Sequence, residues 1–267
     1  MVRNPKQEGS SMFDCRPQTG KCPMNCNQCF YNRPGAFYVP IDKPNVPTPE
    51  EILEMSENFG SGIVRMNCGH DSNLHRDLVI ETAKQYKHFF FNTSIPRFDF
   101  PGPVVFTANA KEEESVLMPS SMDFPKEQKK YLDRIMFVRL RVSASNLRYI
   151  EKGIKGWAIK HGIPVVLTFM AYYEEDALDK VVKNIDAQTL RKFSIAGRDS
   201  YYTWKKRHIN SYYCPTKEFT AYALKTMKKV GGRLVALCGS LDSNYCKDCR
   251  NCETYYLQTI KHLKEKG

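Results

Sequence analysis

Short apolar runs alternate with amphipathic stretches along most of this chain. The runs rich in Val, Ile, Leu and Phe predict β-strands at residues 62–69, 87–95, 102–110, 136–144, 163–173 and 233–239. Between and after them, the helical period predicts helices at residues 48–60, 73–86, 124–135, 147–162, 174–185, 216–232 and 252–267. The first 14 residues show neither pattern, and we expect a loosely packed lead-in there.

Two of these helices carry clear end signals. Thr48 is suited to the N-cap position, Pro49 to the first helical position, and Glu51 completes a capping box. Gly232 is suited to end the helix that is predicted over residues 216–232. These signals fix helix ends that periodicity alone leaves open.

Strands that alternate with helices favour an α/β fold with a parallel sheet of βα units. Such a sheet is either an open doubly wound sheet or an incomplete barrel, and the pattern fits both. In either case functional groups gather at the carboxyl ends of the strands. A length of 267 residues fits one large domain, with or without a small appendage.

The ten cysteines need an explanation that depends on the compartment. No apolar run is long enough to span a membrane, and residues 1–14 lack the apolar stretch of a signal peptide. We therefore expect a cytoplasmic protein that has no membrane partner. In a reducing compartment, clustered cysteines indicate metal ligands or catalytic groups, and seven of the ten lie within residues 22–29 and 238–252.

The first group is Cys22-x3-Cys26-x2-Cys29, in a stretch of turn-forming residues. Three thiolates on one short loop can hold three irons of a 4Fe–4S cluster, which leaves the fourth iron open to another ligand. A zinc site is the alternative, and it would take a fourth ligand from Cys15, Cys68 or His70. The spacing differs from the paired C-x2-C steps of zinc sites, so we favour the cluster.

This loop, followed by βα units, resembles the radical S-adenosylmethionine (radical SAM) superfamily. The resemblance implies a partial (β/α)6 TIM-like barrel, with Cys22, Cys26 and Cys29 as cluster ligands. It also implies that SAM binds the open iron, and that an electron donor such as flavodoxin or ferredoxin reduces the cluster. SAM would then be split to methionine and a 5′-deoxyadenosyl radical, which abstracts hydrogen from a substrate.

The same resemblance suggests where SAM binds. Members often have an aromatic residue just before the third cysteine; this chain has Gln28 there, and Phe30 or Tyr31 is expected to cover the cluster or the adenine instead. Members also often have a Gly-Gly-Glu-like stretch after the second strand. The corresponding residues here are "MNCGHDS", and we expect polar groups of Asn67, Gly69, His70 and Asp71 to replace it.

Polar residues at the ends of later strands are further candidates for cofactor binding. Asn109 lies at the end of one predicted strand, and Arg139, Arg141 and Ser143 alternate along the next. Arginines that face the inside of a barrel require an anionic ligand, such as the SAM carboxylate or a substrate phosphate. The alternative is that they face outward and pair with helix carboxylates. We favour the inner side, because Val138, Leu140 and Val142 on the other face suit helix packing.

The second group is Cys238-x7-Cys246-x2-Cys249-x2-Cys252. Four cysteines close either a structural zinc site or a second 4Fe–4S cluster. Beside an iron–sulfur core we favour the second, auxiliary cluster. The expected organisation is a radical SAM partial barrel over residues 1–200 and a small cysteine-rich C-terminal extension over residues 201–267.

The charge suggests a substrate class. The formal net charge is +11, and residues 200–215 interleave tyrosines and Trp204 with Lys205, Lys206, Arg207 and His208. Aromatics that stack bases beside cations that hold phosphates suit nucleic-acid contacts, although a connector packed on the barrel would also explain them. We expect a nucleic-acid base or nucleotide in DNA or RNA as substrate, for example a hypermodified DNA base that is rearranged.

Two other functions fit the sequence less well. The first is a radical SAM enzyme that acts on a peptide or a small metabolite. The second is a non-enzymatic, zinc-stapled nucleic-acid-binding protein, which leaves the alternating strands and helices without a purpose. The sequence does not distinguish the reaction subtype.

Overall fold

The computed structural model describes residues 2–24, 29, 42–56, 62–108, 125–193, 198–206 and 211–266. Within them, seven strands form one parallel sheet and two more form an antiparallel hairpin. The strands of the sheet are β1 (Met12–Cys15), β2 (Ile63–Met66), β3 (Phe89–Thr93), β4 (Val104–Ala108), β5 (Ile135–Val142), β6 (Val165–Phe169) and β9 (Val235–Leu237). The hairpin strands are β7 (Tyr202–Lys206) and β8 (Ser211–Pro215).

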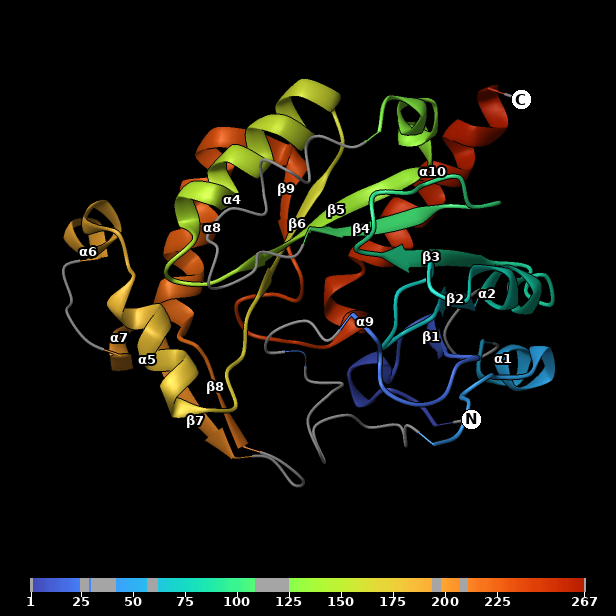
Figure 1. Ribbon diagram of the computed structural model, residues 1–267, viewed down its shortest axis with the longest axis horizontal. Helices are drawn as coiled ribbons and strands as arrows, with labels where there is room; N and C mark the ends of the chain where they lie inside the picture. The colour runs from blue at the N-terminus through green and yellow to red at the C-terminus, as the bar shows by residue number, and fades with distance from the viewer. Residues whose placement is uncertain are drawn as a thin grey trace.

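The sheet curls into half a barrel, with its strands in the order β1-β2-β3-β4-β5-β6-β9 (Figure 1). All six pairings are parallel, so every carboxyl end lies at the same edge. The strand order follows the chain and never reverses, as it would in a doubly wound sheet. Of the two predicted arrangements, the barrel-like one is therefore found, as an incomplete barrel.

The first strand corrects our expectation of a loosely packed lead-in. All four residues of β1 are buried, and β1 pairs with β2 over its whole length. Met12 and Asp14 lie on one face, while Phe13 and Cys15 lie on the other. The alternation was present in the sequence, but four residues are too few to separate a strand from an irregular segment.

Helices occupy most of the predicted positions. The α-helices are α1 (Pro49–Ser56), α2 (Arg76–Ala83), α4 (Leu147–Ile154), α5 (Glu175–Lys183), α6 (Ala187–Phe193), α7 (Arg198–Tyr201), α8 (Lys217–Gly231), α9 (Cys246–Cys249) and α10 (Asn251–Lys266). A π-helical turn, η4 (Lys155–Lys160), extends α4, and 3-10 turns are η1 (Pro5–Gln7), η3 (Lys126–Arg134) and η5 (Gly232–Leu234). The α-helix predicted at residues 124–135 is thus a 3-10 helix. No helix in these residues is long and apolar enough to cross a membrane.

The predicted helix ends are confirmed where the residues are described. The Thr48 hydroxyl accepts the Glu51 amide at 3.2 Å, and the Glu51 carboxylate accepts the Thr48 amide at 2.9 Å, which is a capping box. Gly232 follows α8 with φ +58°, a conformation that favours glycine.

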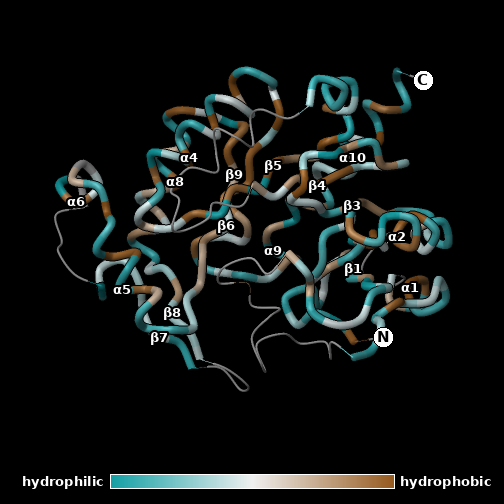
Figure 2. Tube along the Cα trace, viewed as in Figure 1, coloured by the Kyte–Doolittle hydropathy of each residue, from teal (hydrophilic) through white to brown (hydrophobic). Residues whose placement is uncertain are grey.

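Two apolar clusters cover the two faces of the sheet. On the outer face, α4 and α8 pack over strands through residues such as Ile150, Ile154 and Met227. On the inner face, Tyr256 of α10 packs against Phe90 and Phe137, in contact with the amino-terminal part of the sheet. Figure 2 shows hydrophobic colours along the central strands, whereas hydrophobic and hydrophilic colours alternate along the outer helices. Parallel strands buried on both sides explain the near-continuous apolar runs in the sequence.

Residues after 200 contribute directly to the sheet. β9 pairs with β6, α8 packs against α4, and α10 packs against β5. The hairpin β7–β8 occupies the aromatic stretch that the sequence had suggested as a connector or a nucleic-acid contact. The division at residue 200 stays a prediction.

The backbone at Gly231 packs too closely against its neighbours to leave room for a side chain. A Cβ at this position would lie 2.5 Å from the Val235 Cγ2 and 2.6 Å from the Ile154 Cγ2. We expect Gly231→Ala to lower the free energy of unfolding by about 1–3 kcal/mol, because the crowded side chains have to shift. Thermal unfolding measures this as a lower Tm, with Lys229→Ala, at an exposed site of the same helix, as control. Equal Tm values for the two variants would contradict the tight packing.

Candidate functional site

The inner face of the half barrel is divided into an apolar and a polar part. The apolar part, at the amino-terminal side, consists of Met12, Ile63, Phe90, Val105, Phe137, Val166 and Ala236, and α10 packs against it. Towards the carboxyl ends, the alternation of the strands brings polar residues to the same face, namely Asp14, Arg65, Asn92, Thr107, Arg139, Arg141, Thr168 and Cys238. A polar surface at this edge is where ligands bind in barrels.

An ion pair between β1 and β2 anchors one side of this polar surface. Arg65 donates from Nε and Nη2 to the two Asp14 oxygens at 2.7 and 2.8 Å, a bidentate contact. The Asp14 side chain is 2% exposed and also accepts the Gln7 amide at 2.7 Å. Arg65 further contacts the Cys68 sulfur at 3.2 Å. Sequence reasoning missed this pair, since β1 itself was missed.

The loop with the first cysteine group leaves the carboxyl end of β1. Its base is closed by a short antiparallel bridge, in which Arg16 and Asn45 exchange backbone hydrogen bonds of 2.7 and 2.9 Å. Cys22 and Cys29 are both half-buried. Three other residues of this prediction, Cys26, Phe30 and Tyr31, lie outside the described residues.

Two hydrogen bonds join this loop to the loop after β2. The Gln18 side chain donates to the Leu74 carbonyl at 2.6 Å, and the His70 Nε2 contacts the Gly20 carbonyl at 3.0 Å. A carbonyl only accepts, so Nε2 carries the proton. Burial lowers the pKa of His70, which favours the neutral ring. The start of the cysteine loop and the "MNCGHDS" loop are therefore neighbours.

The backbone after β2 turns sharply. Asn67 has φ +59° and Gly69 has φ +96°, both in the left-handed region. Asn67 is fully buried, and its side-chain amide donates to the Asp71 carbonyl at 2.8 Å. No hydrogen bond from a described residue reaches its Oδ1 atom.

Asp71 ties this loop to the loop after β3. One oxygen accepts the Asn73 amide at 2.9 Å and the Thr93 hydroxyl at 2.8 Å. The other accepts the amides of Ser94 and Ile95. Burial raises the pKa of this carboxyl, although the four hydrogen bonds act in the opposite direction. Its role is to position two loops of the site.

The arginines of β5 lie on the inner face, in the orientation that we favoured. Thr107 pairs with Arg139 in register, and their side chains are 3.4 Å apart. Arg139 also lies over the Phe137 ring at 5.8 Å. No carboxylate of the described residues pairs with Arg139. Its neighbour Arg141 contacts the Met170 sulfur at 2.9 Å.

The remaining strand-end candidates differ in their surroundings. The Ser143 hydroxyl contacts the Ser145 hydroxyl at 3.1 Å, and the Ser143 amide donates to Asn146. Ser143 thus belongs to the turn before α4. Asn109 lies outside the described residues.

Three of the buried polar atoms that have no hydrogen-bond partner among the described residues lie where β2, β3 and β6 end. They are the Oδ1 atoms of Asn67 and Asn92 and the Oγ1 atom of Thr168. Buried polar groups are rarely left unpaired, so a bound polar ligand would suit this edge of the sheet.

The second cysteine group approaches the same inner face. Cys238 follows β9, Cys246 and Cys249 belong to α9, and Cys252 is in the first turn of α10. Burial raises the pKa of Cys252 to about 12 and that of Cys246 to about 11. Arg139 and Arg65 lower the pKa of Cys252, and Arg65 that of Cys246, so these thiols lie close to the inner arginines.

Neither zinc nor a second cluster is tested by this geometry. Among the described residues, no three His, Cys, Asp or Glu side chains form a group that could hold a metal ion. The four C-terminal cysteines therefore stay predicted ligands. What the sequence did not reveal is their placement against Arg65 and Arg139, which depends on how α9 and α10 close the inner face.

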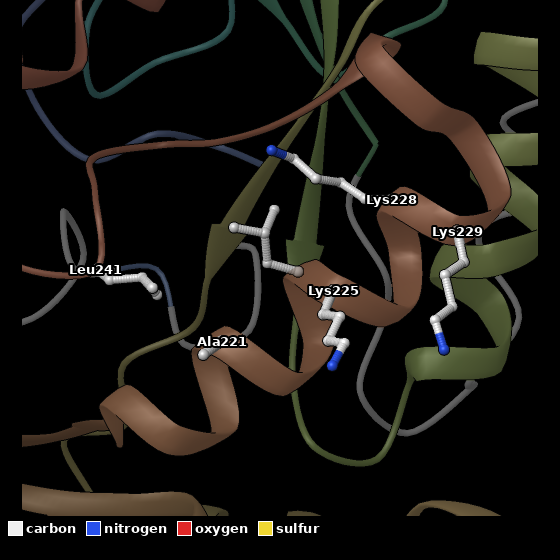
Figure 3. Close-up of a pocket in the computed structure, with 6 residues that line it drawn as sticks. Ala221, Lys225, Lys228, Lys229 and Leu241 are labelled. Carbon is white, nitrogen blue, oxygen red and sulfur yellow. The ribbon is translucent and has the colours of Figure 1, made fainter.

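A separate surface cavity of about 400 Å³ lies beside α8. It is lined by Ala221, Leu224, Lys225, Lys228, Lys229 and Leu241. The three lysine side chains spread apart and do not converge on one point (Figure 3). This open groove shares no lining residue with the polar surface of the sheet, and we do not include it in the site.

Replacement of Asp71 tests how the two loops are held. Each carboxylate oxygen accepts two hydrogen bonds, so in Asp71→Asn one amide nitrogen would face two donors in either orientation. We expect the free energy of unfolding to fall by about 2–4 kcal/mol, as donors lose their acceptor. Chemical denaturation measures this, with Asp77→Asn at an exposed position of α2 as control. Unchanged stability in Asp71→Asn would refute this role.

Comparison with known proteins found no match. No family model matches this chain, and no curated protein or solved structure is similar to it. A functional assignment therefore depends on the residues and geometry of this chain alone.

Proposed function

We propose that this protein is a radical SAM enzyme that abstracts hydrogen from a nucleic-acid base or nucleotide. In this proposal Cys22, Cys26 and Cys29 hold a 4Fe–4S cluster whose fourth iron is open to SAM. When bound and reduced by a donor such as flavodoxin or ferredoxin, the cluster supplies the electron that splits SAM to methionine and a 5′-deoxyadenosyl radical.

One observation carries the proposal. The three-cysteine loop leaves the carboxyl end of the first strand of an incomplete parallel barrel, and it is tied to the loop after the second strand. Catalytic groups of barrel enzymes come from this edge. In the finer version of the proposal, β1 to β6 are the strands of a (β/α)6 core, and β9 is added beside β6.

The residues around the loop suit a ligand with the groups of SAM. The unpaired oxygens of Asn67, Asn92 and Thr168 would accept hydrogen bonds from an ammonium group or from hydroxyls. Arg139, which has no carboxylate partner among the described residues, would bind the carboxylate. Gly69 and His70 would shape this site through backbone groups. We assign Phe30, Tyr31, Asn109, Arg141 and Ser143 to the same site on sequence grounds.

The second cysteine group would hold an auxiliary 4Fe–4S cluster on Cys238, Cys246, Cys249 and Cys252. Four thiolates carry a negative charge that is costly to bury. The nearby guanidinium groups of Arg65 and Arg139 would offset this cost, and both already lower the pKa of Cys252. A zinc ion is the alternative occupant. In either case the C-terminal segment would contribute to the wall of the site.

Anaerobic reconstitution tests the proposed chemistry. We expect purified protein, supplied with iron and sulfide, to convert SAM to 5′-deoxyadenosine when dithionite is added. Cys26→Ala should lose this activity by at least about 100-fold, because one cluster ligand is missing. The control is Cys214→Ser, a half-buried cysteine of the hairpin outside both groups. Metal analysis of Cys249→Ala then distinguishes a second cluster from zinc.

The result that would overturn the proposal is equally definite. Protein that retains zinc in both cysteine groups and leaves SAM intact would be a zinc-stapled binding protein. Product formed by Cys26→Ala as fast as by wild type would show that the cleavage does not depend on this loop.

Substitution of Arg139 tests the binding of SAM. We expect Arg139→Gln to weaken SAM binding about tenfold or more, because a charged hydrogen bond to the carboxylate is worth about 1.5–3 kcal/mol. Equilibrium dialysis with labelled SAM measures the dissociation constant of the reconstituted protein. Arg148→Gln, at an exposed position of α4, is the matched control. If both variants bind SAM like wild type, Arg139 is not the carboxylate ligand.

A further inference from the structure

The hairpin β7–β8 is joined to the carboxyl end of the sheet. Just beyond β6, Tyr172 and Tyr213 exchange backbone hydrogen bonds of 2.9 and 2.8 Å, which link the end of β6 to β8. The hydroxyl of Tyr202 in β7 accepts the Ala144 amide at 3.0 Å, just beyond β5. The base of the hairpin is therefore fixed at the same edge as the polar surface (Figure 1).

Aromatic side chains lie along this hairpin. Trp204 pairs with Tyr213 across the two strands, and their ring centroids are 4.8 Å apart. Tyr212 packs against Tyr173 at 5.8 Å. Trp204 is 52% exposed, whereas the other tryptophan, Trp157, is fully buried. An exposed tryptophan held by a neighbouring ring is a rigid platform on which a base can stack.

Unpaired positive charge lies beside these rings. Lys205 and Lys206 are exposed, and no described acidic side chain forms an ion pair with either of them. Arg198 lies over the Tyr213 ring, but it is already paired with Glu175 and Asp179 and adds no free charge. Among the described residues of the hairpin, Lys205 and Lys206 therefore provide the positive charge that attracts phosphates.

We propose that the hairpin β7–β8 binds single-stranded nucleic acid, with a base stacked on Trp204 and phosphates held by Lys205 and Lys206. A lone exposed ring and flexible lysines suit an unpaired strand, because the bases of a duplex are already stacked on one another. This inference rests on the proposed function, since it gives the substrate class a binding surface beside the site. DNA and RNA share this chemistry.

Binding of labelled 15-mer oligonucleotides by the full chain tests the inference. Fluorescence anisotropy with single-stranded DNA, single-stranded RNA and duplex DNA gives the dissociation constants. We expect Trp204→Ala to weaken single-strand binding about tenfold and Trp204→Phe to restore most of it, since stacking needs only an aromatic face. The tryptophan emission of wild type should be quenched on binding, and Trp204→Ala should lose this quenching.

A second pair of lysines, on α8, serves as a control for nonspecific attraction by the positive charge of the protein. The double variant Lys205→Gln/Lys206→Gln should lower the slope of log K against log salt by about 1.4, as two phosphate contacts are lost. The double variant Lys228→Gln/Lys229→Gln removes the same charge from α8 and should leave the slope near the wild-type value. Equal effects of both pairs, or unchanged binding by Trp204→Ala, would overturn the inference.

The other outcomes are also decisive. If duplex DNA binds as tightly as the single strand, the stacking model is wrong. A lower dissociation constant for single-stranded DNA or for single-stranded RNA would identify which of the two the hairpin binds. The measurement needs neither a cluster nor SAM. If the protein binds the oligonucleotides through the hairpin but does not cleave SAM, only the proposed chemistry is rejected. If it cleaves SAM but does not bind single strands through the hairpin, only this surface is rejected.

Discussion

The structure depends on one constraint, which is that a curled parallel sheet has to be covered on both faces. Outer helices cover one face, as they do in other parallel sheets. On the inner face, α10 packs against the amino-terminal part, where Phe90 and Phe137 meet Tyr256. Towards the carboxyl ends polar side chains replace the apolar ones. The position of the candidate site thus follows from where the inner apolar packing stops.

The N-terminal and C-terminal segments meet across this inner face. Asp14, near the start of the chain, fixes Arg65. Burial raises the pKa of the Cys246 and Cys252 thiols, and Arg65 is close enough to offset part of this rise in both. α9 also contacts the N-terminal turn η1. The two cysteine groups, more than 200 residues apart in the sequence, are therefore both connected to the same part of the sheet.

Local patterns predicted much of this architecture, because strands such as Val165–Phe169 are mostly apolar and Thr48 and Glu51 form a complete capping box. The inner orientation of Arg139 also followed from alternation with Val138 and Leu140. Three features escaped sequence reasoning. β1 has only four residues, which is too few to identify a strand by its period. The proximity of Cys252 to Arg65 and Arg139 depends on how helices pack between distant segments of the chain. The hairpin β7–β8 was missed because its two strands, YTWKK and SYYCP, do not alternate apolar and polar residues.

The place of α10 in the chain has a consequence for biosynthesis. The inner apolar surface belongs to strands from β1 to β9, whereas the helix that packs against it follows every one of them in chain order. A nascent chain therefore exposes this surface until its last described helix has left the ribosome. During that interval the inner face is open, so a chaperone or an assembly factor has access that the folded protein no longer allows. The order of the elements thereby sets a window for maturation.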